Sequence, residues 1–189
     1  MNNFIEVYDN LLHPQLVNEV EDVIFKKNII RWEYNCNISN VPSRNNNPGL
    51  AHLLYNNLPL NKPFNDSLNS FFLQILYRLS FFKNINILNI YQSRIFLQLP
   101  SPNPHPMLEG IHQDLDFPHL VCLYYINDSD GDTLFFKDDK KTEIKRVSPK
   151  KGRIAFFDGS IPHCASTPNK THRAVVNINF IGEPLDTIK

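Results

Sequence analysis

From about residue 85 onward, the chain is a series of short segments in which apolar and polar residues alternate, with a turn signal after most of them. Alternation with a period of two places every second side chain on the same side of an extended backbone, which is typical of β-strands. Many short strands separated by turns rich in Gly, Pro, Asn and Asp predict an all-β sandwich or barrel. The predicted strands are residues 85–99, 120–126, 133–136, 144–147, 153–157 and 173–180.

The earlier part of the chain has a different pattern. Residues 3–8 predict a strand, and residues 13–24 and about 64–80 predict helices, because their apolar residues recur at helical spacing. Residues 38–50 are rich in Asn, Ser and Pro and predict a loop. A long loop of this kind is as consistent with a lid over a site as with a plain connector.

These patterns predict one domain spanning residues 1–189, because this length suits a single core. Residues 1–84 are expected to form a helical N-terminal part and residues 85–181 the core. The expected fold class is α+β, mainly β. Its core would be a double-stranded β-helix (jelly roll, cupin-like) with the N-terminal helices packed outside.

Composition narrows the class of protein. The chain has 19 basic and 19 acidic residues, and this balance argues against nucleic acid as a partner. Hydrophobic residues make up 42% of the sequence, as in a globular protein. The three scattered cysteines form a poor disulfide framework, and we find no signal-peptide or membrane-spanning pattern. We therefore expect a cytoplasmic protein without a membrane partner, and its oligomeric state is left open.

The candidate metal ligands are two histidines and one acid. In the segment 110–116 (GIHQDLD), His112 and Asp114 are two apart, so on an extended strand both side chains would point the same way. About fifty residues later, an apolar strand ends in a turn that delivers His163. Two histidines and one carboxylate with open coordination positions form the facial triad of non-haem iron(II) oxygenases. Taken alone, His112 and Asp114 could equally be surface residues beside a turn, and Asp116 is a rival carboxylate.

A candidate anion-binding residue follows ten positions after His163. Arg173 begins the segment 173–180, in which two sets of side chains alternate. If the apolar set packs in a core, Arg173 and Asn177 face the opposite side, toward a barrel interior. A charged arginine in such a place needs an anionic partner, and a carboxylate gripped by two parallel hydrogen bonds supplies one. The apolar set is Ala174, Val176, Ile178 and Phe180.

With these four residues in order, the chain resembles the iron(II)/2-oxoglutarate-dependent dioxygenases. The segments YYIN at 124–127, DGDTLFF at 130–136 and GRIAFFD at 152–158 resemble the prolyl 4-hydroxylase-like branch of that family. The resemblance covers roughly residues 85–181. It implies an enzyme whose cofactors are Fe(II) and 2-oxoglutarate, with dioxygen as co-substrate.

The resemblance also implies a role for individual residues. His112, Asp114 and His163 match the metal ligands, and Arg173 matches the residue that pairs with the distal carboxylate of 2-oxoglutarate. Tyr125 matches a position that often hydrogen-bonds that carboxylate, and Asn177 a position that lines the same pocket. One position departs from the pattern, because relatives often carry a Tyr at the place of Leu99. Gln98 or Arg94 could supply the missing contact.

The predicted reaction is hydroxylation of an aliphatic carbon, with release of succinate and CO2. The substrate is expected to be a small molecule or peptide: a peptidyl or free amino acid, with a proline-like one as the first hypothesis. Three alternatives remain open at this stage. They are a non-catalytic metal-binding jelly-roll module, a cupin-like metalloenzyme such as an isomerase, and an oxidative demethylase of a modified nucleobase. The Pro-rich segment 99–106 could form a stiff wall beside an extended peptide.

Overall fold

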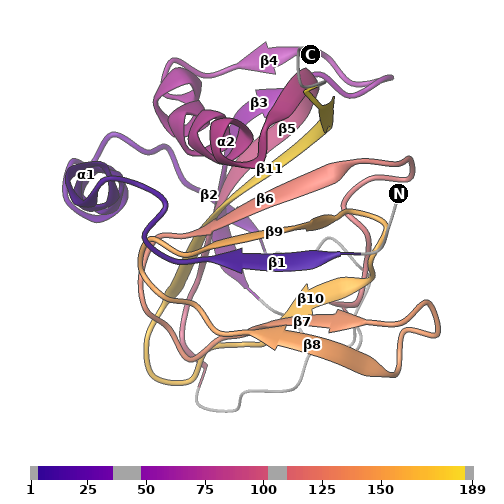
Figure 1. The fold of residues 1–189 in the computed structure, drawn as a ribbon. Helices are drawn as coiled ribbons and strands as arrows, with labels where there is room; N and C mark the ends of the chain where they lie inside the picture. The colour runs from indigo at the N-terminus through magenta and orange to yellow at the C-terminus, as the bar shows by residue number, and fades with distance from the viewer. Residues whose placement is uncertain (1–3, 36–47, 102–109, 186–189) are drawn as a thin grey trace.

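The computed structural model describes residues 4–35, 48–101 and 110–185 of the chain (Figure 1). Within them lie two helices and eleven strands. The helices are α1 (Pro14–Phe25) and α2 (Asn69–Lys83). The strands are β1 (Ile5–Tyr8), β2 (Glu33–Asn35), β3 (Gly49–Asn56), β4 (Phe64–Asn65), β5 (Ile85–Gln98), β6 (Leu120–Tyr125), β7 (Thr133–Phe136), β8 (Glu143–Val147), β9 (Ile154–Asp158), β10 (His163–Ala165) and β11 (Arg173–Pro184).

The strands form two antiparallel sheets. The major sheet has eight strands in the order β1-β9-β6-β11-β5-β3-β2, with β4 paired to β3. The minor sheet has three strands in the order β10-β7-β8. Figure 1 shows the minor sheet on one side of the major sheet and the helices on the other. A helix-covered pair of antiparallel sheets is the jelly roll expected from the sequence, so the predicted fold class is confirmed.

The N-terminal part of the chain contributes strands to the major sheet as well as the two helices. Strand β1 was predicted at residues 3–8, but β2, β3 and β4 also lie within residues 1–84, which were expected to form a helical part. The longest of them, β3, pairs with β5 from Gly49↔Gln98 to Asn56↔Gln92. The sheet is therefore not confined to residues 85–181, and the assignment of residues 1–189 to one domain stays a prediction. Of the predicted loop, residues 38–47 lie outside the described part.

Two apolar cores lie on opposite faces of the major sheet. The first joins the helices to the outer face of the sheet and includes Val23, Leu76 and Val176. The second fills the space between the two sheets and includes Phe135 and Val175. The alternation along β11 is as predicted, because Ala174, Val176, Ile178 and Phe180 all enter the first core. Arg173 and Asn177 consequently belong to the inner face, between the sheets.

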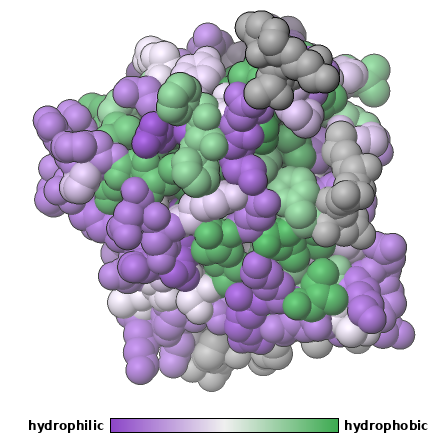
Figure 2. All heavy atoms as spheres, in the orientation of Figure 1, coloured by the Kyte–Doolittle hydropathy of each residue, from purple (hydrophilic) through white to green (hydrophobic). Residues whose placement is uncertain are grey.

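The helices lie close to their predicted positions. Helix α2 begins five residues later than expected, because Phe64 and Asn65 form β4. It ends before Asn84, whose left-handed backbone (φ 54°) is a common way to terminate a helix. Its side chains Phe81 and Phe82 remain exposed. On the face of the molecule that Figure 2 shows, apolar and polar residues are interspersed. Neither described helix is long and apolar enough to cross a membrane.

Candidate active site

The backbones of His112 and His163 pair directly with each other. Each N–H donates to the other residue's carbonyl oxygen, at 3.0 Å from His112 and 2.9 Å from His163. This pair is an isolated β-bridge, and Asp114 follows in a bend. The strand expected to carry His112 and Asp114 is therefore absent from the described residues around them, because the ladder is limited to one residue pair. The pairing nevertheless brings the two imidazole rings to a centroid distance of 5.0 Å.

His112, Asp114 and His163 form a compact triangle of donor atoms, all within 4.8 Å of one another. His112 Nδ1 lies 2.7 Å from the carbonyl oxygen of Gly110, and His163 Nδ1 lies 2.9 Å from that of Ile161. A carbonyl only accepts, so in the neutral rings each Nδ1 carries the proton and each Nε2 keeps a lone pair. Both Nε2 atoms face Asp114 oxygens, at 3.6 and 3.8 Å.

Two lone pairs aimed at a carboxylate repel it unless a cation lies between them. The arrangement of Nε2 atoms around Asp114 therefore fits a bound metal ion. Imidazole nitrogen together with carboxylate oxygen suits iron(II) and leaves coordination positions open. Within residues 4–35, 48–101 and 110–185, these three residues could hold such an ion, and the structure brings them together as the sequence predicted.

The protonation states of Asp114 and His163 also suit metal binding, whereas the raised pKa of His112 favours its charged form, whose Nε2 proton a metal would have to displace. Burial opposes ionisation of Asp114, but the His112 hydrogen bond and the charges of His163 and Arg94 hold the pKa of its carboxyl well below the usual range. Burial lowers the pKa of His163 to about 4. The pKa of His112 is raised, because Asp114 outweighs the opposing effect of burial. An ionised carboxylate and a neutral imidazole are the forms in which these side chains ligate a metal.

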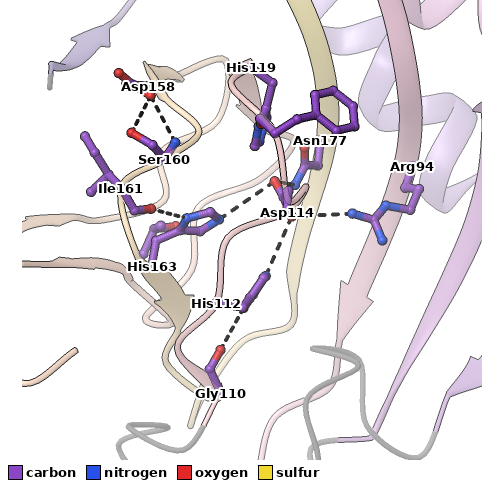
Figure 3. A network of polar contacts seen from close by, with 12 residues as sticks. Arg94, Gly110, His112, Asp114, His119, Asp158, Ser160, Ile161, His163 and Asn177 are labelled. Atoms are coloured by element: carbon purple, nitrogen blue, oxygen red, sulfur yellow. Dashed lines mark hydrogen bonds and ion pairs between the residues drawn. The ribbon is translucent and has the colours of Figure 1, made fainter. Parts of the chain in front are cut away.

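The Asp114 carboxylate is held from two further strands (Figure 3). Asn177 of β11 donates from Nδ2 to one carboxylate oxygen at 2.9 Å. Arg94 of β5 reaches the other oxygen at 3.4 Å. Asn177 thus contacts a candidate metal ligand, and the pocket-lining role expected for it stays a prediction.

The guanidinium of Arg173 is buried and has only neutral hydrogen-bond partners among the described residues. It donates to Gln98 Oε1 at 3.1 Å and to Thr133 Oγ1 at 2.8 Å, and it lies 5.6 Å from the centre of the Tyr125 ring. The Tyr125 hydroxyl donates to the same Thr133 oxygen at 2.7 Å. Arg173 Nε and Gln98 Nε2 are buried donors without a partner. A buried cation beside unpaired donors favours an anionic ligand, so we call Arg173 and Gln98 the candidate anion site.

The metal triangle and this anion site lie along the same inner faces. Arg173 and Asn177 are four residues apart on β11, so both side chains point between the sheets. On the minor sheet, Phe135 pairs with His163, and Thr133 lies two residues further along the same strand. Strand geometry separates such residues by roughly 7 Å. The metal triangle and Arg173 therefore face the same space between the two sheets.

Comparison with known proteins supports the fold. No protein-family model matches the chain, and a search of curated protein sequences finds no match. Among solved structures, a 2OG-Fe(II) oxygenase family oxidoreductase from Burkholderia pseudomallei aligns with a TM-score of 0.67 at 10% identity, covering 93% of this chain and 84% of the other. A prolyl hydroxylase from Trichoplax adhaerens, in complex with a peptide fragment of the hypoxia inducible factor oxygen degradation domain, aligns with a TM-score of 0.62 at 14% identity, covering 95% and 84%. The chain has the fold of the 2-oxoglutarate/iron(II) oxygenases.

Another protein of similar fold is an epimerase. The non-haem α-ketoglutarate-dependent epimerase SnoN from nogalamycin biosynthesis aligns with a TM-score of 0.56 at 13% identity, covering 95% of this chain and 78% of the other. A shared 2-oxoglutarate oxygenase fold is therefore compatible with more than one outcome at the substrate. The reaction of this chain must be argued from its own site.

Sequence reasoning left some residues of this oxygenase-like site without an assignment. Leu99, which departs from the family pattern, is half exposed, and the neighbouring Gln98 contacts Arg173. Of the two candidates for the missing contact, Gln98 is thus at the anion site and Arg94 is at Asp114. Thr133 was not singled out at all, because a threonine in a strand carries no signal until the strand pairing is known.

Proposed function

We propose that this protein is an iron(II)- and 2-oxoglutarate-dependent dioxygenase that hydroxylates an aliphatic carbon of an amino acid, peptidyl or free. A proline-like side chain is the first substrate to test. The observation that carries the proposal is the buried Arg173, whose described partners are all neutral, on the same face of β11 as the residue that holds Asp114. A dicarboxylate ligand that also chelates a metal supplies the missing anion.

Each group has a defined task in this proposal. His112 and His163 hold iron through Nε2, with their Nδ1–H groups fixed by backbone carbonyls, and Asp114 supplies the third ligand. Arg173, with Tyr125 beside it, holds the distal carboxylate of 2-oxoglutarate. When bound there, iron(II) and 2-oxoglutarate would supply the oxidising power to insert one oxygen atom of dioxygen into a C–H bond, with release of succinate and CO2.

The side chains around His163 keep water away from this chemistry. The ring of Phe157 lies 4.9 Å from the His163 ring, and that of Phe135 lies 6.0 Å from it. Both phenylalanines are fully buried with Val175 in the core between the sheets. A dry wall on this side strengthens the electrostatic hold on an anionic cosubstrate and limits side reactions.

The choice of an amino-acid substrate rests on three supports. The sequence resembles the prolyl 4-hydroxylase-like branch, and the prolyl hydroxylase of similar fold is bound to a peptide fragment. The charge of the chain is balanced, which favours a peptide or small molecule over a nucleic acid. The segment 102–106, proposed above as part of a wall beside a peptide, lies outside the described residues.

The proposal is tested by succinate formation from 2-oxoglutarate with iron(II), with and without prolyl peptides and free amino acids. We expect turnover that depends on one of these substrates and is lost in Asp114→Ala. The matched control is Asp116→Ala, which removes the exposed carboxylate two residues further along. Metal binding without any consumption of 2-oxoglutarate would indicate a non-catalytic module. Turnover coupled only to methylated DNA or RNA would replace the amino-acid substrate with a nucleobase.

A further inference from the structure

Arg94 is a second buried arginine in the site, and the proposed oxygenase reaction assigns it no task. It lies on β5 opposite Asn177 of β11, and its guanidinium carbon lies 4.9 Å from the centre of the Phe96 ring. Its hydrogen bond to Asp114 is the one polar contact found for it among the described residues. Its Nε is buried without a partner, while 18% of the side chain remains exposed.

Asp114 is a poor permanent partner for this guanidinium. The 3.4 Å contact is longer than the roughly 2.7–2.9 Å of a charge-assisted hydrogen bond. Asn177 already holds the same carboxylate at 2.9 Å. Once Asp114 shares its negative charge with a metal ion, its attraction for Arg94 weakens further. Arg94 can therefore donate N–H hydrogen bonds to another ligand beside the metal site.

The balance of charge in the site also favours an anionic ligand for Arg94. Arg94 and Arg173 each bring one positive charge, a divalent metal brings two, and Asp114 brings one negative charge. A bound 2-oxoglutarate dianion still leaves one positive charge in a largely buried space. Uncompensated buried charge is costly, so a substrate with one negative charge would complete the site.

The position of Arg94 decides which part of a substrate it would hold. Arg94 and His112 contact the same oxygen of Asp114, at 3.4 and 3.6 Å, so they lie within two contact distances of each other. Figure 3 shows Arg94 on the opposite side of Asp114 from His163. A carboxylate gripped by Arg94 would therefore place its neighbouring carbons close to the metal position. A residue in the middle of a peptide has no main-chain carboxylate to offer there.

We propose that Arg94 binds the carboxylate of the substrate, so that the substrate is a free amino acid or the C-terminal residue of a peptide. This inference rests on the proposed function, because it places that carboxylate in the substrate pocket of the oxygenase. It narrows the substrate class from any peptidyl or free residue to one with a free carboxylate.

The test measures binding without turnover. Protein loaded with Mn(II) and 2-oxoglutarate is titrated calorimetrically with free L-amino acids, with the corresponding amides, and with tripeptides that end in the same residues as acid or amide. We expect at least one acid to bind roughly 10- to 100-fold more tightly than its amide, as for a lost hydrogen bond to a charged group. The free amino acid and tripeptide series separate the two sources of carboxylate.

Two variants assign the preference to Arg94. In Arg94→Met the acid and the amide should bind within about twofold of each other, while Mn(II) and 2-oxoglutarate still bind as in the wild type. The matched control is Arg146→Met, which removes a half-exposed arginine of β8 and should keep the preference.

Several outcomes would overturn the inference. They are equal binding of acid and amide by the wild type, binding of none of the acids, and a preference that survives Arg94→Met. Loss of Mn(II) binding in Arg94→Met would make Arg94 a positioning residue for Asp114 instead. A carboxylate preference in protein that never turns over 2-oxoglutarate with iron would contradict the proposed function but leave this inference standing.

Discussion

At the scale of single residues, Arg173 differs from a typical surface arginine in its burial and in the neutrality of its partners. Gln98 and Thr133 satisfy part of the guanidinium, but neither carries charge to balance it. Burial accordingly lowers the pKa of Arg173 from its ordinary value. Among the described residues, this charged group has no anionic partner, so an anionic ligand would compensate it.

We expect Arg173→Met to weaken 2-oxoglutarate binding while metal binding persists. Removing one partner of a buried charged pair costs about 3–5 kcal/mol, or roughly 100- to 1,000-fold or more in affinity. Tyr125→Phe removes a hydroxyl of the same cluster and should have a smaller effect, about 1.5–3 kcal/mol if it bonds the carboxylate. Calorimetric titration of the Mn(II)-loaded variants measures both. Unchanged affinity in Arg173→Met would mean that the cosubstrate carboxylate lies elsewhere.

At the scale of elements, the turn between β9 and β10 positions His163. Asp158 accepts hydrogen bonds from the Ser160 N–H at 3.0 Å and from its hydroxyl at 2.7 Å. The N–H of Gly159 donates to the carbonyl of His119 at 2.9 Å. The His119 ring, whose Nε2 is buried without a hydrogen-bond partner, packs directly over Gly159, so there is no space for a side chain.

Gly159→Ala should therefore destabilise the turn and weaken metal binding. The added methyl group would overlap the His119 ring, and overpacking of this kind typically costs about 1–3 kcal/mol. Denaturant unfolding and Mn(II) titration measure the two effects. The control is the double variant Gly159→Ala with His119→Ala, in which the smaller side chain makes room for the methyl group. If the effects of Gly159→Ala and of His119→Ala alone simply added in the double variant, the contact with His119 would not explain why residue 159 is a glycine.

The contact between the β1–α1 turn and the start of β9 predicts a pH dependence. Asp9 accepts hydrogen bonds from Arg153 Nε at 2.8 Å and from Arg153 Nη2 at 2.9 Å, and these bonds lower the pKa of Asp9 to about 2. A carboxyl with a lowered pKa stabilises the fold above its ordinary pKa near 3.8, and this contribution is lost as the pH falls toward 2.

Asp9→Asn should thus cost about 0.5–1 kcal/mol at pH 7, a modest value because the pair is partly exposed. The difference from wild type should shrink between about pH 4 and pH 2. Urea unfolding at several pH values measures it. Asp138→Asn, at the exposed tip of the β7–β8 hairpin, is the charge-matched control and should leave stability nearly unchanged. A penalty that stayed constant down to the lowest pH would contradict the assignment.

The sequence could predict an element when its pattern is contained in neighbouring residues, but not when the element depends on pairing with a distant strand. The long alternating strand β5 was predicted almost to its bounds because its pattern is local. Strands β2, β4 and β10 are two or three residues long and too short to show a period. In the site, the spacing of the metal ligands is a sequence property. The placing of Thr133 beside Arg173, and of Arg94 beside Asp114, depends on strand pairing and had no local signal.

At the scale of the whole molecule, the site joins the two sheets, which also meet through the apolar core between them. His163 and Thr133 belong to the minor sheet, whereas Arg173 and Asn177 belong to the major sheet. A metal ion and a cosubstrate that contact all four would connect the sheets across their shared interior. Ligand binding should then stabilise this connection more than it stabilises distant parts of the fold.

Hydrogen exchange should show this difference. With Mn(II) and 2-oxoglutarate at about a hundred times their dissociation constants, each ligand stabilises the bound protein by up to about 2.7 kcal/mol. We expect amides of β7 and β10 to exchange more slowly, with a smaller change in α1, which packs in the other core on the outer face of the major sheet. Arg173→Met with Mn(II) alone serves as the control without the cosubstrate. Equal slowing in α1 and in the minor sheet would mean that the sheets open only when the entire chain unfolds, and that the site does not connect them.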